Sequence, residues 1–530
     1  MRLRAGQLFA ANRGKLVPLT SICTLLVLLG VVWALASPHG SAADDDYHLT
    51  SIWCIQGESD YCRDAGDDVG RLVPRIIAYP GCFVNFPSSV SAACSNELTY
   101  ELIYTTRWNK PESGYPVGFH WTLSWLAGKD AVASVLLMRV FNVLLASLLL
   151  FFTALCVPSN LRHALLLGWA VGLIPVGIFF IASTNPSSWL ISGLGVYWAL
   201  LLGLVQNQPA SPSVKVLRVL LLLVAIAMIL LARRDGGLYL MVITLTAFIM
   251  SASVRTRLSK LRIGIPLALA LIGAVAMFRI WGSTFFASAR FPGAQTATDQ
   301  PNPFVKTLIE TPSYFVALFG GQEPRFVIRG SGVSQGVEGY TPTGFTYGLG
   351  WTDFSLPSAV GITAFSAFLV AVTVGFNWSS KRKAIAFSTL LAFIPLQALA
   401  VRSAYEFRDV ALLQPRYMVP VLIPLAGIAL LSYGKTPRIF NWFQASVIVS
   451  CVSVAGSLAW LATAGRYAIG PDGAFTNFGQ SPDWWWSTGP SRLVLFLLVS
   501  VLTLSWVFLA LQRYGVGRRR AELAQNGYAS

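Results

Sequence analysis

Charged residues are scarce in this chain of 530 residues, at 12% of the sequence against about 25% in an ordinary soluble protein. Hydrophobic residues make up 55%. Such a deficit of charge along the whole length excludes a set of soluble domains. The composition instead predicts an all-α polytopic membrane protein, because apolar runs of about 20 residues cross a bilayer as helices.

Acidic residues are the scarcer of the two charged kinds, with 23 Asp and Glu against 39 Lys and Arg and a net charge of +16. In a soluble protein this balance would suggest a nucleic-acid partner. Here many basic residues lie in short loops between apolar runs, where they set the orientation of the helices. No recognition helix, zinc-knuckle spacing or RNP-like motif accompanies them, so we expect no nucleic acid among the partners.

Histidine is rarer still, with four residues in the whole chain, and this argues against a histidine-rich metal site. The chain also lacks a Walker motif, a GxSxG elbow, an HExxH motif and a dinucleotide fingerprint. We predict no metal site and no certain cofactor. A divalent cation on the acidic cluster Asp44–Asp46 stays open.

Apolar runs long enough to span a bilayer predict about twelve transmembrane helices. We expect them at 17–37, 131–157, 163–183, 187–206, 214–232, 237–253, 263–281, 356–376, 384–401, 417–433, 440–464 and 491–512. The first run has a basic flank like that of a signal peptide, but we expect it to stay uncleaved, since the charge count requires it. A shorter apolar run at 312–320, bordered by Pro and Gly, predicts an interfacial or re-entrant piece.

The placement of Lys and Arg predicts a multi-pass protein of the cytoplasmic (inner) membrane, with both termini in the cytoplasm. The same count puts the loops 402–416 and 465–490 outside. The expected segments are a cytoplasmic N-terminus at 1–16, a first helix at 17–37, an extracytoplasmic loop at 38–130, helices two to seven over 131–281, a second extracytoplasmic loop at 282–355, helices eight to twelve over 356–512 and a basic cytoplasmic tail at 513–530.

Cysteines are few, seven in all, and four of them lie in the predicted outer loop 38–130. An even set on the oxidising side of a membrane indicates two disulfides. Of the three pairings, the simplest is Cys54–Cys62 with Cys82–Cys94, but the sequence does not fix it, and free thiols are the alternative.

Three consecutive carboxylates, Asp44, Asp45 and Asp46, follow the first predicted helix, with His48 two residues on. Like charges this close repel one another and lose hydration, so a chain that needs only a polar loop rarely places them together. We predict that Asp45 or Asp46 serves as a base at the mouth of a membrane cavity. A solvated acidic turn is the alternative.

Arginines in two other predicted outer segments indicate an anionic ligand, because guanidinium groups bind phosphate oxygens bidentately. Charges at membrane level are costly and tend to be functional or paired. The alternative for Arg233 and Arg234 is snorkelling to lipid headgroups, and the alternative for the arginines of the loop 402–417 is neutralisation by Glu406 and Asp409. The residues concerned are Arg233 and Arg234, followed by Asp235, together with Arg402, Arg416 and Tyr417, the last two of which open a helix with a favourable dipole for an anion.

Other residues are weaker candidates for orienting a substrate. They are Asn185, Trp351 and Asp353, together with Asp44 and Asp235. A segment with Arg107, Tyr115 and His120, and the tryptophans 484–486, suit an aromatic belt at the membrane interface or a sugar-stacking surface, and the belt is the simpler interpretation.

Four of these segments together resemble the domain-of-unknown-function family 2142 of predicted bacterial membrane proteins, and they follow the order of the family along most of the chain. Two positions depart from the usual pattern of the family, with Ser187 in place of Asp and Pro415 in place of Gly. The four segments are Asp45-Asp46-Tyr47-His48, Asn185-Pro186, Leu349–Pro357 and Gln414–Pro420.

The layout of this family is similar to that of GT-C glycosyltransferases. The resemblance implies transfer of a sugar from a polyprenyl-phosphate donor to a glycan or lipid acceptor of the cell envelope, outside the cytoplasmic membrane. Asp45 or Asp46 would then be the base, and His48 would orient hydroxyl groups together with Asp353. Arg233, Arg234 and Arg416 would hold the phosphate. The alternatives are a transporter or flippase of a lipid-linked sugar, and a non-catalytic subunit of an assembly complex.

Overall fold

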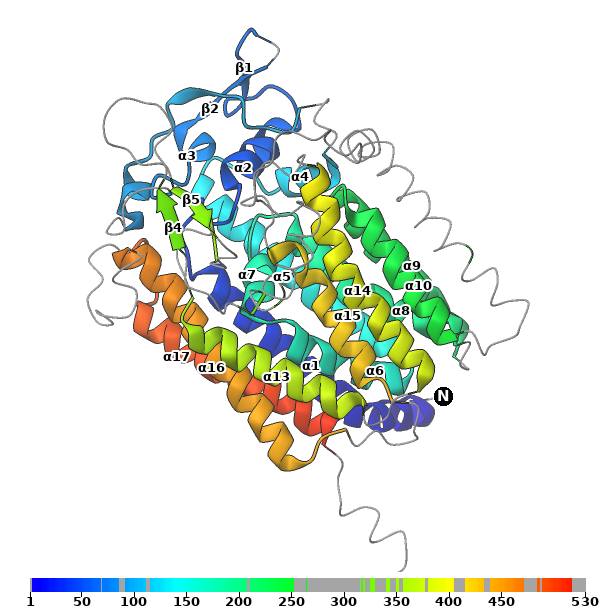
Figure 1. Ribbon diagram of the computed structural model, residues 1–530. Helices are drawn as coiled ribbons and strands as arrows, with labels where there is room; N and C mark the ends of the chain where they lie inside the picture. The colour runs from blue at the N-terminus through cyan, green and yellow to red at the C-terminus, as the bar shows by residue number, and fades with distance from the viewer. Residues whose placement is uncertain are drawn as a thin grey trace, which may run out of the picture.

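A computed structural model describes most of the chain and places it in one helical bundle with a cap at one end (Figure 1). The described residues are 2–67, 69–84, 91–110, 115–206, 210–251, 356–376, 380–404, 415–432, 439–470, 484–486 and 489–516, with short pieces between 264 and 351. Side chains are described from residue 16 onwards.

Eleven of the twelve expected apolar runs are helical, and the twelfth, 263–281, lies outside the described residues. The bundle helices are α1 (Arg2–Ala34), α5 (Ala131–Cys156), α6 (Ser159–Gly172), α7 (Pro175–Ile181), α8 (Ser187–Val205), α9 (Pro212–Ala232), α10 (Gly236–Ser251), α13 (Ser358–Phe376), α14 (Lys381–Ala404), α15 (Val419–Leu430), α16 (Trp442–Ile469) and α17 (Arg492–Ala510). A short helical turn, η6 (Leu511–Gly515), extends α17. The expected piece at 312–320 falls almost wholly outside the described residues.

The expected number of about twelve spans is not reached in the described part of the chain. Eight helices are long and apolar enough to cross a membrane, or nine if the pair α6 and α7 counts as one span. That pair bends by 97°, where Pro175 starts a new helix and lacks an N–H to continue the old one. α15 has 12 residues, about 18 Å at 1.5 Å per residue, which is shorter than a bilayer core of about 30 Å.

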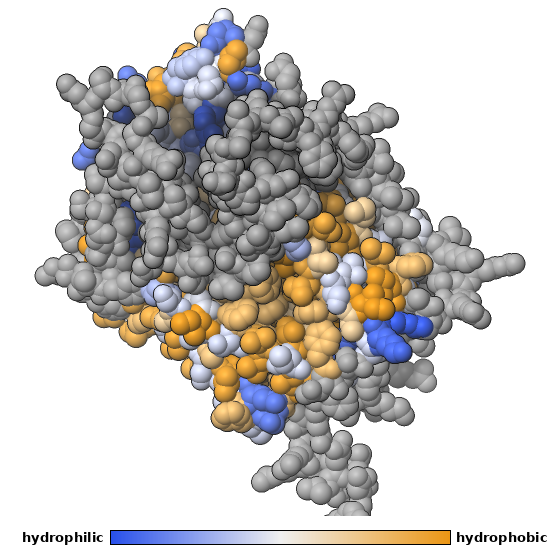
Figure 2. Space-filling view, viewed as in Figure 1, coloured by the Kyte–Doolittle hydropathy of each residue, from blue (hydrophilic) through white to orange (hydrophobic). Residues whose placement is uncertain are grey.

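The surface of the bundle is apolar where a bilayer would surround it. Figure 2 shows hydrophobic residues over the flank of the bundle and hydrophilic residues at the tip of the cap. Leu396 of α14 and Val501 of α17 are 61% and 60% exposed, while the span of α8 is 94% buried inside the bundle. A helix that is apolar all round and buried belongs at the centre of a bundle, so α8 is the core around which the others pack.

The cap departs from an all-α fold, because it contains a small antiparallel sheet in the order β1-β2-β3. Its elements are α2 (Asp45–Cys54), β1 (Arg63–Asp64), β2 (Arg71–Pro74), α3 (Arg75–Ala78), η1 (Ala92–Glu97), β3 (Leu102–Thr105) and α4 (Gly118–Ser124). A second antiparallel pair is formed by β4 (Arg325–Ile328) and β5 (Tyr340–Thr343).

The four cysteines of the cap lie in two pairs at disulfide-bond distance. The sulfur atoms are 1.99 Å apart in Cys54–Cys62 and 2.02 Å apart in Cys82–Cys94. This is the pairing of sequence neighbours, the simplest of the three that the sequence left open. One bond fixes the end of α2 to the start of the sheet, and the other closes the segment that leads into η1.

Segments that are far apart in the sequence meet at the end of the bundle that carries the cap. Trp486 Nε1 donates to the carbonyl oxygen of Leu35 at 2.9 Å. At the opposite end, the N–H of Ile439 donates to the carbonyl oxygen of Gly515 at 3.1 Å. The bundle thus has one end that carries the cap and one end that does not. Which of the two faces the cytoplasm stays a prediction.

The loop between α1 and α2 depends on a glycine, and this predicts a large loss of stability on substitution. Gly40 has φ +76°, and a Cβ there would come within 2.4 Å of the Pro80 backbone. Gly57 also has a positive φ, +96°, but has open space around it. We expect Gly40→Ala to lower the free energy of unfolding by about 3 kcal/mol and Gly57→Ala by about 1 kcal/mol. Thermal unfolding in detergent measures the difference, and equal losses would contradict this packing.

Candidate functional site

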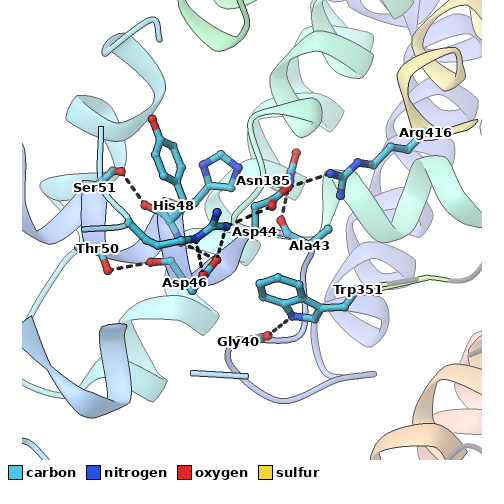
Figure 3. A network of polar contacts seen from close by, with 12 residues as sticks. Gly40, Ala43, Asp44, Asp46, His48, Thr50, Ser51, Asn185, Trp351 and Arg416 are labelled. Carbon is cyan, nitrogen blue, oxygen red and sulfur yellow. Dashed lines mark hydrogen bonds and ion pairs between the residues drawn. The ribbon is translucent and has the colours of Figure 1, made fainter. Parts of the chain in front are cut away.

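The loop 38–44 is the point at which the four sequence motifs come together (Figure 3). Asn185 Nδ2 donates to the carbonyl oxygen of Ala43 at 2.9 Å, and Trp351 Nε1 donates to that of Gly40 at 2.8 Å. Arg416 Nη2 donates to Asp44 Oδ2 at 2.8 Å. Residues from three distant parts of the chain therefore fix one short loop at the start of α2.

Asp44 has an unusual backbone conformation. Its φ is 61°, and among the described residues it is the one non-glycine residue with a positive φ. A left-handed conformation is disfavoured for side chains with a Cβ, and such residues gather at functional sites. It precedes α2, and its carbonyl oxygen accepts hydrogen bonds from the N–H groups of Tyr47 and His48. The turn thus directs the Asp44 carboxylate away from the helix axis and toward Arg416.

Arg107 links the two outer carboxylates of the triplet. Its Nε lies 2.6 Å from Asp46 Oδ2 and its Nη2 lies 2.9 Å from Asp46 Oδ1, which makes a bidentate pair. Its Nη2 also lies 3.4 Å from Asp44 Oδ1. The Arg107 side chain is 51% exposed, and the Asp44 and Asp46 side chains are 43% and 22% exposed. The acidic triplet is therefore neutralised by arginine and open on one side, rather than solvated on its own.

Asp44 is held in its charged form by its neighbours. Burial opposes ionisation of this carboxyl group, but Arg416 and His48, together with Arg107, lower its pKa below the usual value. The pKa of Arg416, the partner of Asp44, is also shifted so that the charged form is favoured. Burial disfavours the charged form of Arg416, yet the charges of Tyr417 and Asp44 raise its pKa. The pair is thus an ionised one across the pH range of a living cell.

Asp45 faces the opposite way and is fully buried. Its carboxylate accepts a hydrogen bond from Thr184 Oγ1 at 2.5 Å and one from the N–H of Ala42 at 3.0 Å. Burial raises its pKa to about 6. With no surface through which a substrate can reach it, Asp45 anchors the loop to the segment between α7 and α8. The geometry therefore favours Asp46 over Asp45 as the base.

Arg416 lies in the short turn η4 (Pro415–Tyr417) and has donors to spare. The residue is 4% exposed, and only its Nη2 is used on Asp44. Its Nε and Nη1 are buried with no hydrogen-bond partner among the described residues. A buried guanidinium with unpaired N–H groups is costly, at about 1–3 kcal/mol for each unsatisfied group. Such a group is stabilised by an anion that accepts from either donor, and because Nε and Nη1 lie on opposite sides of Nη2, one anion would use Nη2 together with one of them.

Arg233 lies near the same tyrosine but is neutralised within its own turn. Its Nε and Nη2 lie 2.8 and 2.9 Å from the two oxygens of Asp235. Its Cζ lies 4.6 Å from the centre of the Tyr417 ring, and the Cζ of Arg416 lies 5.5 Å from it. Gln397 Nε2 also donates to Asp235, at 3.2 Å. The two guanidinium groups thus flank one aromatic ring, and Arg233 is paired with Asp235, which is neither the snorkelling nor the free phosphate clamp that the sequence suggested.

The remaining predicted residues are less informative. Arg234 is half-buried in the turn beside Arg233. Arg402 has its backbone in α14, but its side chain lies outside the described residues. Asp353 also lies outside the described residues. No group of three His, Cys, Asp or Glu side chains within the described part of the chain could hold a metal ion, and a cation on the triplet stays open.

A buried histidine pair lies behind the acidic triplet, and nothing in the sequence pattern indicates that the two residues meet. His48 Nδ1 lies 3.1 Å from His120 Nε2, and the rings stack at 5.4 Å between their centres. Burial lowers the pKa of His120 to about 3 and that of His48 well below its usual value. Both rings are therefore neutral, and one donates to the other. This pairing locks the first turn of α2 onto α4.

The histidine pair predicts an acid-sensitive fold. His120 stays neutral in the folded protein down to a pKa of about 3, whereas in the unfolded chain it takes up a proton below about 6.5. Stability is thus fully present above pH 6.5 and falls as the pH drops, by on the order of 1.4 kcal/mol per pH unit. We expect His120→Asn to flatten this slope in thermal unfolding between pH 7 and pH 4.5. Because the pKa of Asp45 is raised to about 6, its protonation stabilises the folded protein as the pH falls below 6. This contribution is the same in the wild type and in His120→Asn, so it cancels when their slopes are compared. Parallel slopes would contradict the expectation.

Arg139 is a buried residue that the sequence analysis passed over. It lies within α5 and is 2% exposed. Its two terminal nitrogens donate to the carbonyl oxygens of Ala34, Ser37 and Pro38. These groups end α1 and begin the loop, so Arg139 satisfies carbonyls that the helix leaves unpaired. A charged residue inside an apolar run was the signal that could have revealed it.

Comparison with known proteins places this arrangement in a family. No curated protein matches the chain. The family of predicted membrane proteins called DUF2142 matches residues 26–425, which include the end of α1, the acidic triplet, Asn185, Trp351 and Arg416. Because the match covers most of the 530 residues and every motif that meets at the loop 38–44, the chain belongs to the DUF2142 family of predicted membrane proteins.

Proposed function

We propose that the protein is a GT-C-type glycosyltransferase that moves a sugar from a polyprenyl-phosphate donor to a glycan or glycolipid of the cell envelope. The cap end of the bundle would face the outer side of the cytoplasmic membrane, with both termini in the cytoplasm. The donor would be held by its phosphate at the site between η4 and the acidic triplet, with its prenyl chain in the lipid beside the bundle.

One observation supports this proposal above the others. Arg416 is buried at the end of the bundle, is held by Asp44 through one nitrogen, and keeps two N–H groups unpaired among the described residues. A phosphate offers oxygens that accept charge-assisted hydrogen bonds from such a buried guanidinium. The η4 turn also stands directly before α15, so the dipole at the start of that helix favours an anion there.

The acidic triplet would supply the proton chemistry. In the transfer, the acceptor hydroxyl attacks the anomeric carbon of the sugar, and the bond from that carbon to the phosphate oxygen breaks. Asp46 would take the hydroxyl proton, and polyprenyl phosphate would leave with the electron pair. Arg416 would stabilise the charge that develops on the leaving phosphate. Arg107, bound to both Asp44 and Asp46, would keep the base oriented.

The proposal is tested by transfer assays with membranes that contain the protein and a panel of prenyl-phosphate sugars. We expect one donor to label an envelope glycan or glycolipid in membranes with the wild-type protein and not in membranes without it. A wild-type protein that is present and folded, yet transfers none of the sugars, would contradict the enzyme. Movement of the same lipid-linked sugar across proteoliposomes without transfer would favour the transporter instead.

A further inference from the structure

A cavity lies beside the loop that precedes the acidic triplet. Its volume is about 270 Å³, and His39 lines it only five residues before Asp44. The residues between are fixed, because Trp351 Nε1 donates to Gly40 and Tyr467 Oη donates to the carbonyl oxygen of Ser41. The two sites therefore share one rigid loop, yet the cavity contains none of the arginines described above.

Two residues that line this cavity each carry a buried polar atom without a partner in the part of the chain that the structure describes. His39 is 5% exposed, and its Nε2 is buried with no hydrogen-bond partner among the described residues. The same holds for Trp485 Nε1 in that part of the chain. Both residues line the cavity. Two buried polar atoms without partners beside one cavity indicate a ligand that offers both a donor and an acceptor.

The lining combines an aromatic side with short polar groups. Trp485 is held rigidly, with its ring 4.3 Å from that of Trp484 and 6.1 Å from that of Tyr467. Polar groups are supplied by Asn96, which is exposed, and by Asp130, which also caps α5. An aromatic surface beside amide and carboxylate groups suits a ring with apolar C–H bonds and several hydroxyl groups.

The electrostatics distinguish this cavity from the phosphate site. Burial and the charge of Arg139 lower the pKa of His39 to about 4, so this ring is neutral at pH 7. The one charged residue that lines the cavity is Asp130, which is negative. An anion such as phosphate is therefore disfavoured. The volume is just below the range of about 300–1,000 Å³ for cavities that hold drug-sized ligands, so it suits a single ring.

We propose that this cavity is a binding site for one neutral pyranose unit of a glycan. Trp485 packs on the apolar face of the ring, while His39, Asn96 and Asp130 bind its hydroxyl groups. Its further assignment, as the subsite that holds the acceptor sugar, rests on the proposed function. The binding itself does not, and it can be measured without any transfer reaction.

The test uses the full-length protein in lipid nanodiscs and a panel of methyl glycosides of glucose, galactose, mannose and arabinose. Saturation-transfer NMR reads binding at millimolar concentration. We expect at least one glycoside to bind saturably, and Asn96→Ala and Asp130→Asn each to weaken it by at least five-fold. Asparagine also caps a helix, so Asp130→Asn leaves the start of α5 intact.

Glu97→Ala is the matched control, because Glu97 is an exposed neighbour of Asn96 in η1 that does not line the cavity. It should bind the glycoside as the wild type does. The proposal is overturned if no glycoside binds the wild type, or if Asn96→Ala and Glu97→Ala bind equally well. Binding that survives while every donor fails in the transfer assay would keep this site and remove only the proposed reaction.

Discussion

Replacing Arg416 by alanine is expected to lower kcat/KM for the polyprenyl-phosphate sugar by about 10²–10³, the loss that follows removal of one preorganised donor to a developing oxyanion. The reason is that Arg416 brings two unpaired N–H groups to the site, and alanine brings none. Arg416→Lys should recover part of the loss, since it restores the charge but not the planar fork. Initial rates over a range of donor concentrations measure both effects.

The matched control for Arg416 is Arg71→Ala. Arg71 also pairs with an aspartate, with its Nη1 3.1 Å from Asp64, and it lies in the sheet of the cap. It should transfer sugar at nearly the wild-type rate. If Arg416→Ala is folded by thermal unfolding and retains full activity, Arg416 does not hold the phosphate.

Asp46→Asn is expected to lower kcat by about 10²–10⁴ with little change in the amount of folded protein, because a base of this kind contributes about that factor. Asparagine has nearly the shape of aspartate, and its carbonyl oxygen can still accept the hydrogen bond from the N–H of Tyr47 that Asp46 Oδ1 accepts. The substitution thus removes the proton acceptor and leaves the turn. Steady-state transfer with a saturating donor measures the effect.

Two further aspartates separate a base from a merely structural role. Asp64→Asn removes a carboxylate from the sheet of the cap and should leave kcat unchanged. Asp45→Asn disturbs the bond to Thr184, so it should lower the thermal midpoint more than Asp46→Asn does. Activity that survives in Asp46→Asn and disappears in Asp45→Asn, with both proteins folded, would reverse the assignment made above.

The helices were predictable from the sequence, because an apolar run inside a bilayer can satisfy its own backbone hydrogen bonds only as a helix. The bend between α6 and α7 was not, because the run 163–183 stays apolar through it. The break depends on local details, a proline at 175 and a glycine at 172. A Cβ at Gly172 would meet the backbone of Ile423 at 2.8 Å, so the chain turns where α15 packs closest.

The candidate site was predictable in part and for a chemical reason. A charge at membrane level is costly unless it is paired with the opposite charge. Arg416 could therefore be expected near the triplet, although 372 positions separate it from Asp44. Arg107 carried no such signal, because it lies in a polar segment where a charge needs no partner. Which aspartate of the triplet is buried was also not predictable, because three identical side chains in a row do not show which one faces the interior from the start of α2.

The account depends on the two unpaired nitrogens of Arg416 being the place where the donor phosphate binds. The most direct test is a cryo-EM structure of the protein in nanodiscs with a non-hydrolysable polyprenyl-phosphate sugar. We expect a phosphate oxygen within about 3 Å of Arg416 Nε or Nη1, with the sugar beside Asp46. A phosphate bound elsewhere on the protein, with Arg416 still paired only to Asp44, would contradict it.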